Sequence, residues 1–202
     1  DPDRQVLVCA ADVRRTAPGS DLEQLFGDGG AALLLGTKDP IATLEGSFSV
    51  SEEYLDPWRK GDDEFPRWGD TAFIQSYGYQ RLVKECVAGL LQRQGLAVGD
   101  ISKLVLNAPD ARSPQSVARS LEFGQTQLVD PLRGSLGDAG HASPLLLLIG
   151  AQEHAQPGDR LLLCNYSSGN ADAFLFRVTD AVQSARTRRG TGYYLQRRRD
   201  MV

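Results

Sequence analysis

Two polar segments that follow apolar runs hold the residues best suited to chemistry. Asn107 comes directly after the apolar run 104–106, and Asp138 and His141 follow Gly137 further along the chain. In α/β proteins, strand ends and the helix starts beside them present side chains and backbone amides to a ligand. An amide donates hydrogen bonds to a carbonyl oxygen, a carboxylate accepts them, and an imidazole exchanges protons near neutral pH. These segments therefore predict a ligand-binding site.

A third segment of this kind is the glycine loop 167–170. It lies between two apolar runs, 160–164 and 173–178. Gly169 has no side chain and would allow a ligand to approach the backbone closely. A tight β-turn between two strands explains the same residues equally well.

Composition limits the chain to a soluble globular class. It has 202 residues, of which 41% are hydrophobic and 24% charged, enough for one domain with a core or for one to two small ones. No apolar run approaches the roughly 20 residues of a membrane-spanning helix, so no membrane partner is expected. The N-terminus has neither a signal-peptide pattern nor a starting methionine. We therefore expect a cytoplasmic chain that is part of something larger, as a fragment or a subunit.

Cysteine and histidine usage argues against a metal site. The three cysteines, Cys9, Cys86 and Cys164, are odd in number and lack metal-type spacing, and there are only two histidines, His141 and His154. Cys9 and Cys164 lie in apolar, strand-like runs and Cys86 lies on the apolar face of an expected helix, which predicts reduced, buried thiols in a cytosolic protein. We expect no metal and no bound cofactor.

Charge is concentrated at the C-terminus. From Arg186 onward six arginines face one acid, Asp200, so this tail carries +5 and the rest of the chain −9. A basic tail can bind phosphates or nucleic acid, but a solvated terminal helix is the favoured interpretation. Tyr193 and Tyr194 would pack that helix onto the body. We therefore do not expect nucleic acid as the main partner, because no base-stacking platform accompanies the arginines.

The order of elements predicts a layered α/β sheet. Strand patterns alternate with helical ones after an initial group of three strands, which we expect to form one edge of a larger sheet. Two helices are expected to open at Ser-Pro pairs, with Ser113 and Ser143 as N-caps, and Gly95 should end the long helix. The expected strands are 6–13, 31–35, 41–50, 101–106, 160–164 and 173–178; the expected helices are 71–95, 113–121 and 143–156.

These motifs, in this order, resemble the later part of the thiolase superfamily. The similarity is to the 3-hydroxy-3-methylglutaryl-CoA synthases, particularly the archaeal type, and more distantly to the initiating beta-ketoacyl-carrier-protein synthases. Each motif is weak alone, but together they cover most of the chain. The segments that carry the resemblance are 26–36, 54–59 with 65–69, 107–113, and 137–143 with 157–169.

The resemblance implies a thiolase-like αβαβα fold, and it divides the chain. Residues 1–50 would be the closing strands of the N-terminal half, 51–182 the C-terminal half and 183–202 a basic tail. It also implies a homo- or heterodimer, and a missing N-terminal half or partner chain that completes the sheets.

The same resemblance implies acyl transfer, with a coenzyme A thioester or an acyl-carrier protein as the substrate. Asn107 stands at the family's catalytic histidine and Asp138 at its asparagine. An amide cannot replace the histidine as a base, and an ionised carboxylate would repel an oxyanion. His141, oriented by Asp138, is a possible replacement base, although a surface role for His141 is favoured. Gly137, Ser168 and Gly169 would bind the substrate, the glycine loop through its backbone amides in an oxyanion hole.

Two functional hypotheses follow. In the first, the complete protein is a condensing acyltransferase with altered acid/base positions, whose nucleophilic cysteine lies outside this chain. In the second, it is a catalytically degenerate scaffold that binds an enzyme, an acyl-carrier protein or an OB-fold protein. Lys103, Arg112 and Arg59 are candidates for the CoA phosphates, but surface charge explains each of them as well.

Overall fold

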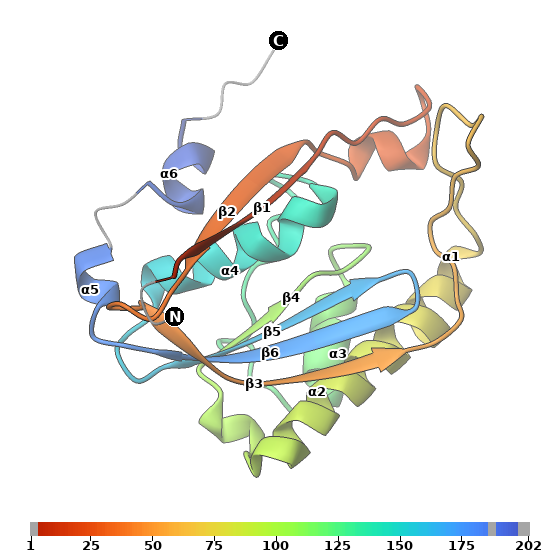
Figure 1. The fold of residues 1–202 in the computed structure, drawn as a ribbon. Helices are drawn as coiled ribbons and strands as arrows, with labels where there is room; N and C mark the ends of the chain where they lie inside the picture. Colours follow the sequence, from red (N-terminus) through yellow and green to blue (C-terminus); the bar gives the residue numbers. More distant parts are fainter. Residues whose placement is uncertain (1–3, 186–188, 198–202) are drawn as a thin grey trace.

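The computed structural model describes residues 4–185 and 189–197 and folds them into two β-sheets with helices between and below them (Figure 1). One sheet has two strands and the other has four. The layered α/β class predicted from the sequence is confirmed. Among the described residues, no helix combines the length and the apolar character that a membrane span requires.

The two-stranded sheet is an antiparallel pair formed by β1 (Val6–Asp12) and β2 (Gly29–Leu35). The third strand, β3 (Ala42–Ser51), pairs with β6 in the other sheet. The expectation that the first three strands share one sheet edge is therefore wrong. The apolar patterns identify each strand but do not say with which strand it pairs, and the proposed division at residue 50 falls after a strand of the second sheet.

The four-stranded sheet has the order β3-β6-β5-β4. Strand β4 (Lys103–Leu106) runs parallel to β5 (Arg160–Ser167), and β6 (Asn170–Val178) is antiparallel to both of its neighbours. Leu162 and Cys164 pack on one side of this sheet, while Leu161 and Leu163 pack on the other. Because both faces are covered, β5 is apolar almost throughout.

Helix α2 (Arg81–Gln94) covers one face of this sheet. A short α1 (Thr71–Phe73) and a π-helical segment, η2 (Ile74–Gln80), precede it, so the predicted helix 71–95 is present with one irregular stretch. Gly95 ends α2 with a φ of 65°, the left-handed conformation that glycine adopts without a steric cost. The predicted glycine cap is confirmed.

Helices α3 (Ser113–Ser120) and α4 (Ser143–His154) open at the two Ser-Pro pairs. The serines are the first helical residues, however, and Arg112 and Ala142 occupy the N-cap positions, so the predicted N-caps are wrong by one residue. In α3 the carboxylate of Asp110 accepts hydrogen bonds from the backbone amides of Arg112 and Ser113 and satisfies the helix start instead. The remaining short elements are η1 (Asp21–Gln24), η3 (Val98–Asp100), η4 (Gly140–Ala142), α5 (Val182–Ala185) and α6 (Thr191–Leu195).

The layers follow one another as the β1–β2 pair, α4, the four-stranded sheet, and α2 with α3 (Figure 1). The outer face of the β1–β2 pair is apolar and open to solvent: Leu7 is 63% exposed, its partner Leu34 is 62% exposed, and Cys9 is exposed too. Cys86 and Cys164 are buried as predicted, but the prediction for Cys9 is wrong, because in the part of the chain that the structure describes this face is open to solvent. A mainly apolar cavity of about 400 Å³ adjoins the pair, between β2, α4 and α6.

The C-terminal helix α6 contacts α4 through hydrogen bonds. Thr191 Oγ1 donates to the carbonyl oxygen of Leu146, and the amide of Gly192 donates to Glu153. The expectation that Tyr193 and Tyr194 both pack onto the body is met only in part, because Tyr193 is half-buried whereas Tyr194 is 63% exposed. Several of the tail arginines lie outside the described residues, at positions 186, 188, 198 and 199.

Candidate functional site

The predicted site residues meet at the carboxyl ends of the parallel strands β4 and β5. One cavity of about 410 Å³ is lined by Asn107, Asp138, His141 and Ser168, together with the end of β1 and the segment around Asp56. Because β4 and β5 are parallel, the residues that follow β4 and the turn that follows β5 reach the same sheet edge. The start of α4 brings the third segment there. The other two predicted site residues, Gly137 and Gly169, do not line the cavity themselves. They are adjacent in sequence to Asp138 and Ser168, which do.

Asn107 is held by two side chains. Its Nδ2 donates to Asn165 Oδ1 at 3.0 Å, and its Oδ1 accepts from Nη2 of Arg133 at 3.4 Å. Its backbone amide donates to the carbonyl oxygen of Cys164 on β5 at 3.2 Å. The sequence did not indicate either partner. Arg133 lies on an irregular connection before α4, and Asn165 lies within an apolar strand.

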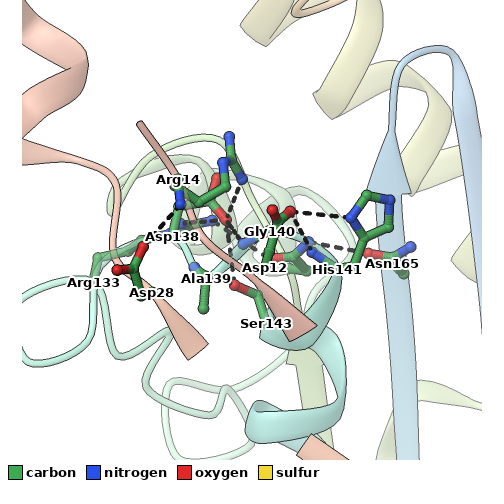
Figure 2. A network of polar contacts seen from close by, with 11 residues as sticks. Asp12, Arg14, Asp28, Arg133, Asp138, Ala139, Gly140, His141, Ser143 and Asn165 are labelled. Carbon is green, nitrogen blue, oxygen red and sulfur yellow. Dashed lines mark hydrogen bonds and ion pairs between the residues drawn. The ribbon is translucent and has the colours of Figure 1, made fainter. Parts of the chain in front are cut away.

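Asp138 lies between two arginines (Figure 2). Its Oδ1 is 3.4 Å from Nη1 of Arg14 and 3.2 Å from Nη1 of Arg133, whose side chain is 7% exposed. The same oxygen accepts from the amide of Gly140 at 3.0 Å and from Ser143 Oγ at 3.2 Å. Arg14 also covers the ring of Phe26, with its guanidinium carbon 3.7 Å from the ring centroid. The carboxylate is therefore compensated by positive charge on two sides.

The possible Asp138–His141 contact is absent among the described residues, and the favoured surface position of His141 agrees with the structure. His141 Nδ1 lies 3.0 Å from Oδ2 of Asp12, and its side chain is 85% exposed (Figure 2). Gly140, with a φ of 56°, turns the chain so that the ring faces the end of β1. Partial burial acts to raise the pKa of Asp12, but the hydrogen bonds from His141 outweigh it and lower that pKa. His141 lies at the open mouth of the cavity.

The glycine loop is a tight turn between β5 and β6, as the alternative interpretation expected. Ser167 pairs with Asn170, and the two residues between them both have positive φ, 44° at Ser168 and 84° at Gly169. Ser168 Oγ donates to the carbonyl oxygen of Asp56 at 2.6 Å, and Gly169 accepts from the amide of Glu52 at 2.8 Å. The turn thus fastens the connection that follows β3 against the cavity. A role of its amides in substrate binding stays a prediction.

Asp56 is a cavity residue that sequence reasoning missed. It is 3% exposed, and its Oδ1 has no hydrogen-bond partner in the part of the chain that the structure describes. Burial raises the pKa of Asp56 to about 6. Burial and the nearby Asp56 also raise the pKa of Tyr166, another buried residue of the cavity wall. A carboxyl group that titrates near neutral pH is suited to acid/base work. In the sequence, Asp56 lies in the segment 54–59, one of the segments that carry the resemblance.

We predict that Asp56→Asn stabilises the protein above pH 6. A carboxyl whose pKa is raised by folding, here from 3.8 to about 6, contributes stability below pH 4 that is lost as the pH rises through 6. Asparagine does not ionise, so the variant avoids this loss of stability. Its free energy of unfolding should exceed that of the wild type by about 2 to 3 kcal/mol at pH 8, since a pKa shift of one unit corresponds to roughly 1.4 kcal/mol. The two proteins should differ little at pH 4. Urea unfolding between pH 4 and pH 8 measures this.

The control is Asp62→Asn, which removes a carboxylate that is exposed to solvent. It should leave the pH dependence of unfolding as in the wild type. Equal curves for Asp56→Asn and the wild type would contradict the assignment of a buried, unpaired carboxyl at position 56.

A metal site would need a cluster of acidic, histidine or cysteine side chains. Within residues 4–185 and 189–197, no group of three or more His, Cys, Asp or Glu side chains is arranged to hold a metal ion. Of the candidates for CoA phosphates, Lys103 donates from Nζ to the carbonyl oxygen of Thr126 at 2.7 Å, whereas Arg59 and Arg112 are exposed. Their role toward CoA stays a prediction.

Comparison with known proteins finds relatives in sequence and in fold. The chain is 34% identical over 183 residues to the hydroxymethylglutaryl-CoA synthase of Methanopyrus kandleri, which covers 89% of the chain and 52% of that relative. It is also 34% identical over 199 residues to the synthase of the same name from Aeropyrum pernix, covering 95% and 54%. The chain thus spans about half the length of the curated relatives it matches. No model of a protein family matches it.

Solved structures agree in fold. An HMG-CoA synthase complexed with CoA superposes with a TM-score of 0.81 at 20% identity, over 98% of this chain and 54% of that one. The 3-oxoacyl-[acyl-carrier-protein] synthase III of Aquifex aeolicus superposes with a TM-score of 0.71 at 18% identity, over 86% and 57%. The chain therefore has the fold of the thiolase superfamily, and its sequence is similar to about half the length of hydroxymethylglutaryl-CoA synthases.

Proposed function

We propose that this chain is the acyl-thioester-binding portion of a condensing acyltransferase. The observation that carries the proposal is the convergence of the segments at 107, 138 and 168 on one cavity of about 410 Å³. The names of the relatives add a substrate class, coenzyme A thioesters, with acyl-carrier thioesters as the alternative. The cavity offers amide donors, a tight glycine turn and a buried carboxyl to such a ligand.

The nucleophile of the proposed reaction would come from outside these 202 residues. Cys86 and Cys164 belong to the buried core between α2 and the sheet, and Cys9 is exposed on β1. The cavity is lined by none of these three. A thiolate that attacks an acyl thioester must stand beside the bound acyl group. Another polypeptide segment, in the same protein or in a partner, would therefore supply the cysteine and cover the open face of β1–β2.

A saturable change in tryptophan fluorescence on adding acetyl-CoA tests the proposal. Of the two tryptophans, Trp68 lines the cavity and Trp58 does not. Trp58→Phe should therefore keep the ligand-dependent signal, and Trp68→Phe should lose it. A signal that survives in Trp68→Phe, or no saturable signal in the wild type, would refute binding in this cavity.

A scaffold without chemistry is the second candidate, and one observation favours it. Asn107 cannot exchange a proton, and Asp138 is held by Arg14 and Arg133. Both residues stand where the resemblance places residues of the catalytic chemistry, and both are fixed in polar contacts. Mass spectrometry of the completed assembly after incubation with acetyl-CoA separates the two candidates. An acylated cysteine indicates the acyltransferase, and binding without acylation indicates the scaffold.

A further inference from the structure

Behind the residues that line the cavity, a buried guanidinium contacts two of them, Asn107 and Asp138. The side chain of Arg133 is 7% exposed, and it reaches Asn107 Oδ1 with Nη2 and Asp138 Oδ1 with Nη1. Two of its nitrogens, Nε and Nη1, have no hydrogen-bond acceptor of good geometry among the described residues. Burying a guanidinium costs free energy unless a counter-ion and hydrogen bonds compensate it, and here Asp138 is the counter-ion and Asn107 accepts a hydrogen bond.

Arg133 determines which way the amide of Asn107 faces. A guanidinium only donates hydrogen bonds, so the atom of Asn107 that meets it must be the carbonyl oxygen. The amide nitrogen therefore faces the other way, toward Asn165 Oδ1 at 3.0 Å. Asn165 in turn presents its oxygen to Asn107, so its own amide group takes no part in this contact, and both residues line the cavity.

Two amide groups thus adjoin each other on the wall of one cavity. Each NH₂ group has two hydrogens, and the contact between the two asparagines uses one of the four. The others are donors without charge and without a proton to exchange. Such a pair matches the carbonyl oxygen of an acyl group, which accepts two hydrogen bonds.

We propose that Asn107 and Asn165 form a binding site for the carbonyl oxygen of an acyl thioester, and that Arg133 is the positioning residue that orients them. This inference rests on the proposed function, because it concerns the acyl group of the same ligand. It differs from a proton-exchanging histidine site in that the pair holds the carbonyl and transfers nothing. Asp138 serves as the counter-ion that keeps Arg133 in place.

The test compares acetyl-CoA with S-ethyl-CoA, a thioether that has a CH₂ group in place of the carbonyl. Binding of both to the full chain is measured by the fluorescence of Trp68 or by calorimetry. The wild type should prefer acetyl-CoA by about tenfold, the effect of two neutral hydrogen bonds. Asn107→Ala, Asn165→Ala and Arg133→Met should each reduce this ratio to about two, with the affinity for S-ethyl-CoA unchanged.

Further variants separate positioning from general damage. Arg133→Lys keeps the positive charge but has a single donor nitrogen in place of the planar guanidinium. For this variant we expect a preference for acetyl-CoA over S-ethyl-CoA of about threefold. Arg93→Met and Gln92→Ala, both on the exposed face of α2, should retain the full ratio. In infrared difference spectra, the carbonyl stretch of bound acetyl-CoA should lie at lower frequency in the wild type than in Arg133→Met.

The outcomes distinguish this inference from the proposed function. Equal binding of both ligands by the wild type would overturn the carbonyl site while leaving thioester binding intact. A full preference in Arg133→Met, with the infrared shift retained, would overturn the role of Arg133. If neither ligand binds, the proposed function and this inference fall together.

Discussion

Replacing Gly169 with alanine is expected to lower the free energy of unfolding by about 3 to 4 kcal/mol, the sum of a backbone cost and a packing cost. Gly169 has a φ of 84°, which an alanine adopts only at a cost of about 1 to 2 kcal/mol. A Cβ atom there would also lie 2.4 Å from the carbonyl oxygen of Glu52 and 2.8 Å from that of Tyr54. These are backbone atoms and cannot rotate away, so the connection after β3 must shift. Thermal or urea unfolding measures the loss.

Gly158→Ala is the matched control. Gly158 has a φ of 88°, close to that of Gly169, but a Cβ atom there would have no neighbour within 4 Å. It should show the backbone cost alone, about 1 to 2 kcal/mol. Equal losses in both variants would show that the contact with Glu52 and Tyr54 does not determine the stability of the loop.

The displaced connection also carries Asp56, whose carbonyl oxygen accepts from Ser168. Gly169→Ala should therefore weaken acetyl-CoA binding even at temperatures where the protein remains folded. The loop would then affect the cavity through packing and not through a side chain. This consequence is specific to Gly169 and should be absent from Gly158→Ala.

Much of the fold could be predicted because the local patterns are strong. The apolar run in β5 and the αL glycine at position 95 follow from burial on both sheet faces and from backbone sterics. The meeting of Asn107 with the glycine turn follows from the parallel pairing of β4 with β5. These features depend on short stretches of sequence or on a rule of sheet topology.

What could not be predicted depends on contacts between distant segments. Arg133 meets Asn107 across 26 positions, and His141 meets Asp12 across 129, so no local pattern indicates either pair. Asp56 is buried because the Ser168–Gly169 turn holds its segment over the cavity. The pairing of β3 with β6 is likewise a choice between two sheets that the strand pattern of β3 does not encode.

Asp138→Ala is expected to lower the free energy of unfolding by about 3 to 5 kcal/mol, the cost of leaving one member of a buried ion pair alone. The variant removes the carboxylate that lies 3.2 Å from Arg133, a side chain only 7% exposed. Asn107 Oδ1 would remain as a neutral contact at 3.4 Å, which cannot balance a full charge. Removing the carboxylate destabilises Arg14 less than Arg133, because the side chain of Arg14 is 17% exposed and still covers the ring of Phe26. Chemical unfolding at pH 7 gives the size of the effect.

The double variant Asp138→Ala/Arg133→Met decides whether the loss comes from the charge or from the other bonds of Asp138. If the unpaired guanidinium causes it, methionine removes that charge while filling similar space, and the double variant should recover about 2 kcal/mol or more relative to Asp138→Ala. If the bonds to Gly140 and Ser143 dominate, the two substitutions should add, and the double variant should be no more stable than Asp138→Ala. His141→Ala provides the reference, because a ring that is 85% exposed should contribute less than about 0.5 kcal/mol. A recovery would establish Asp138 as the counter-ion of Arg133, which is the role that the carbonyl-binding arrangement of Asn107 and Asn165 requires.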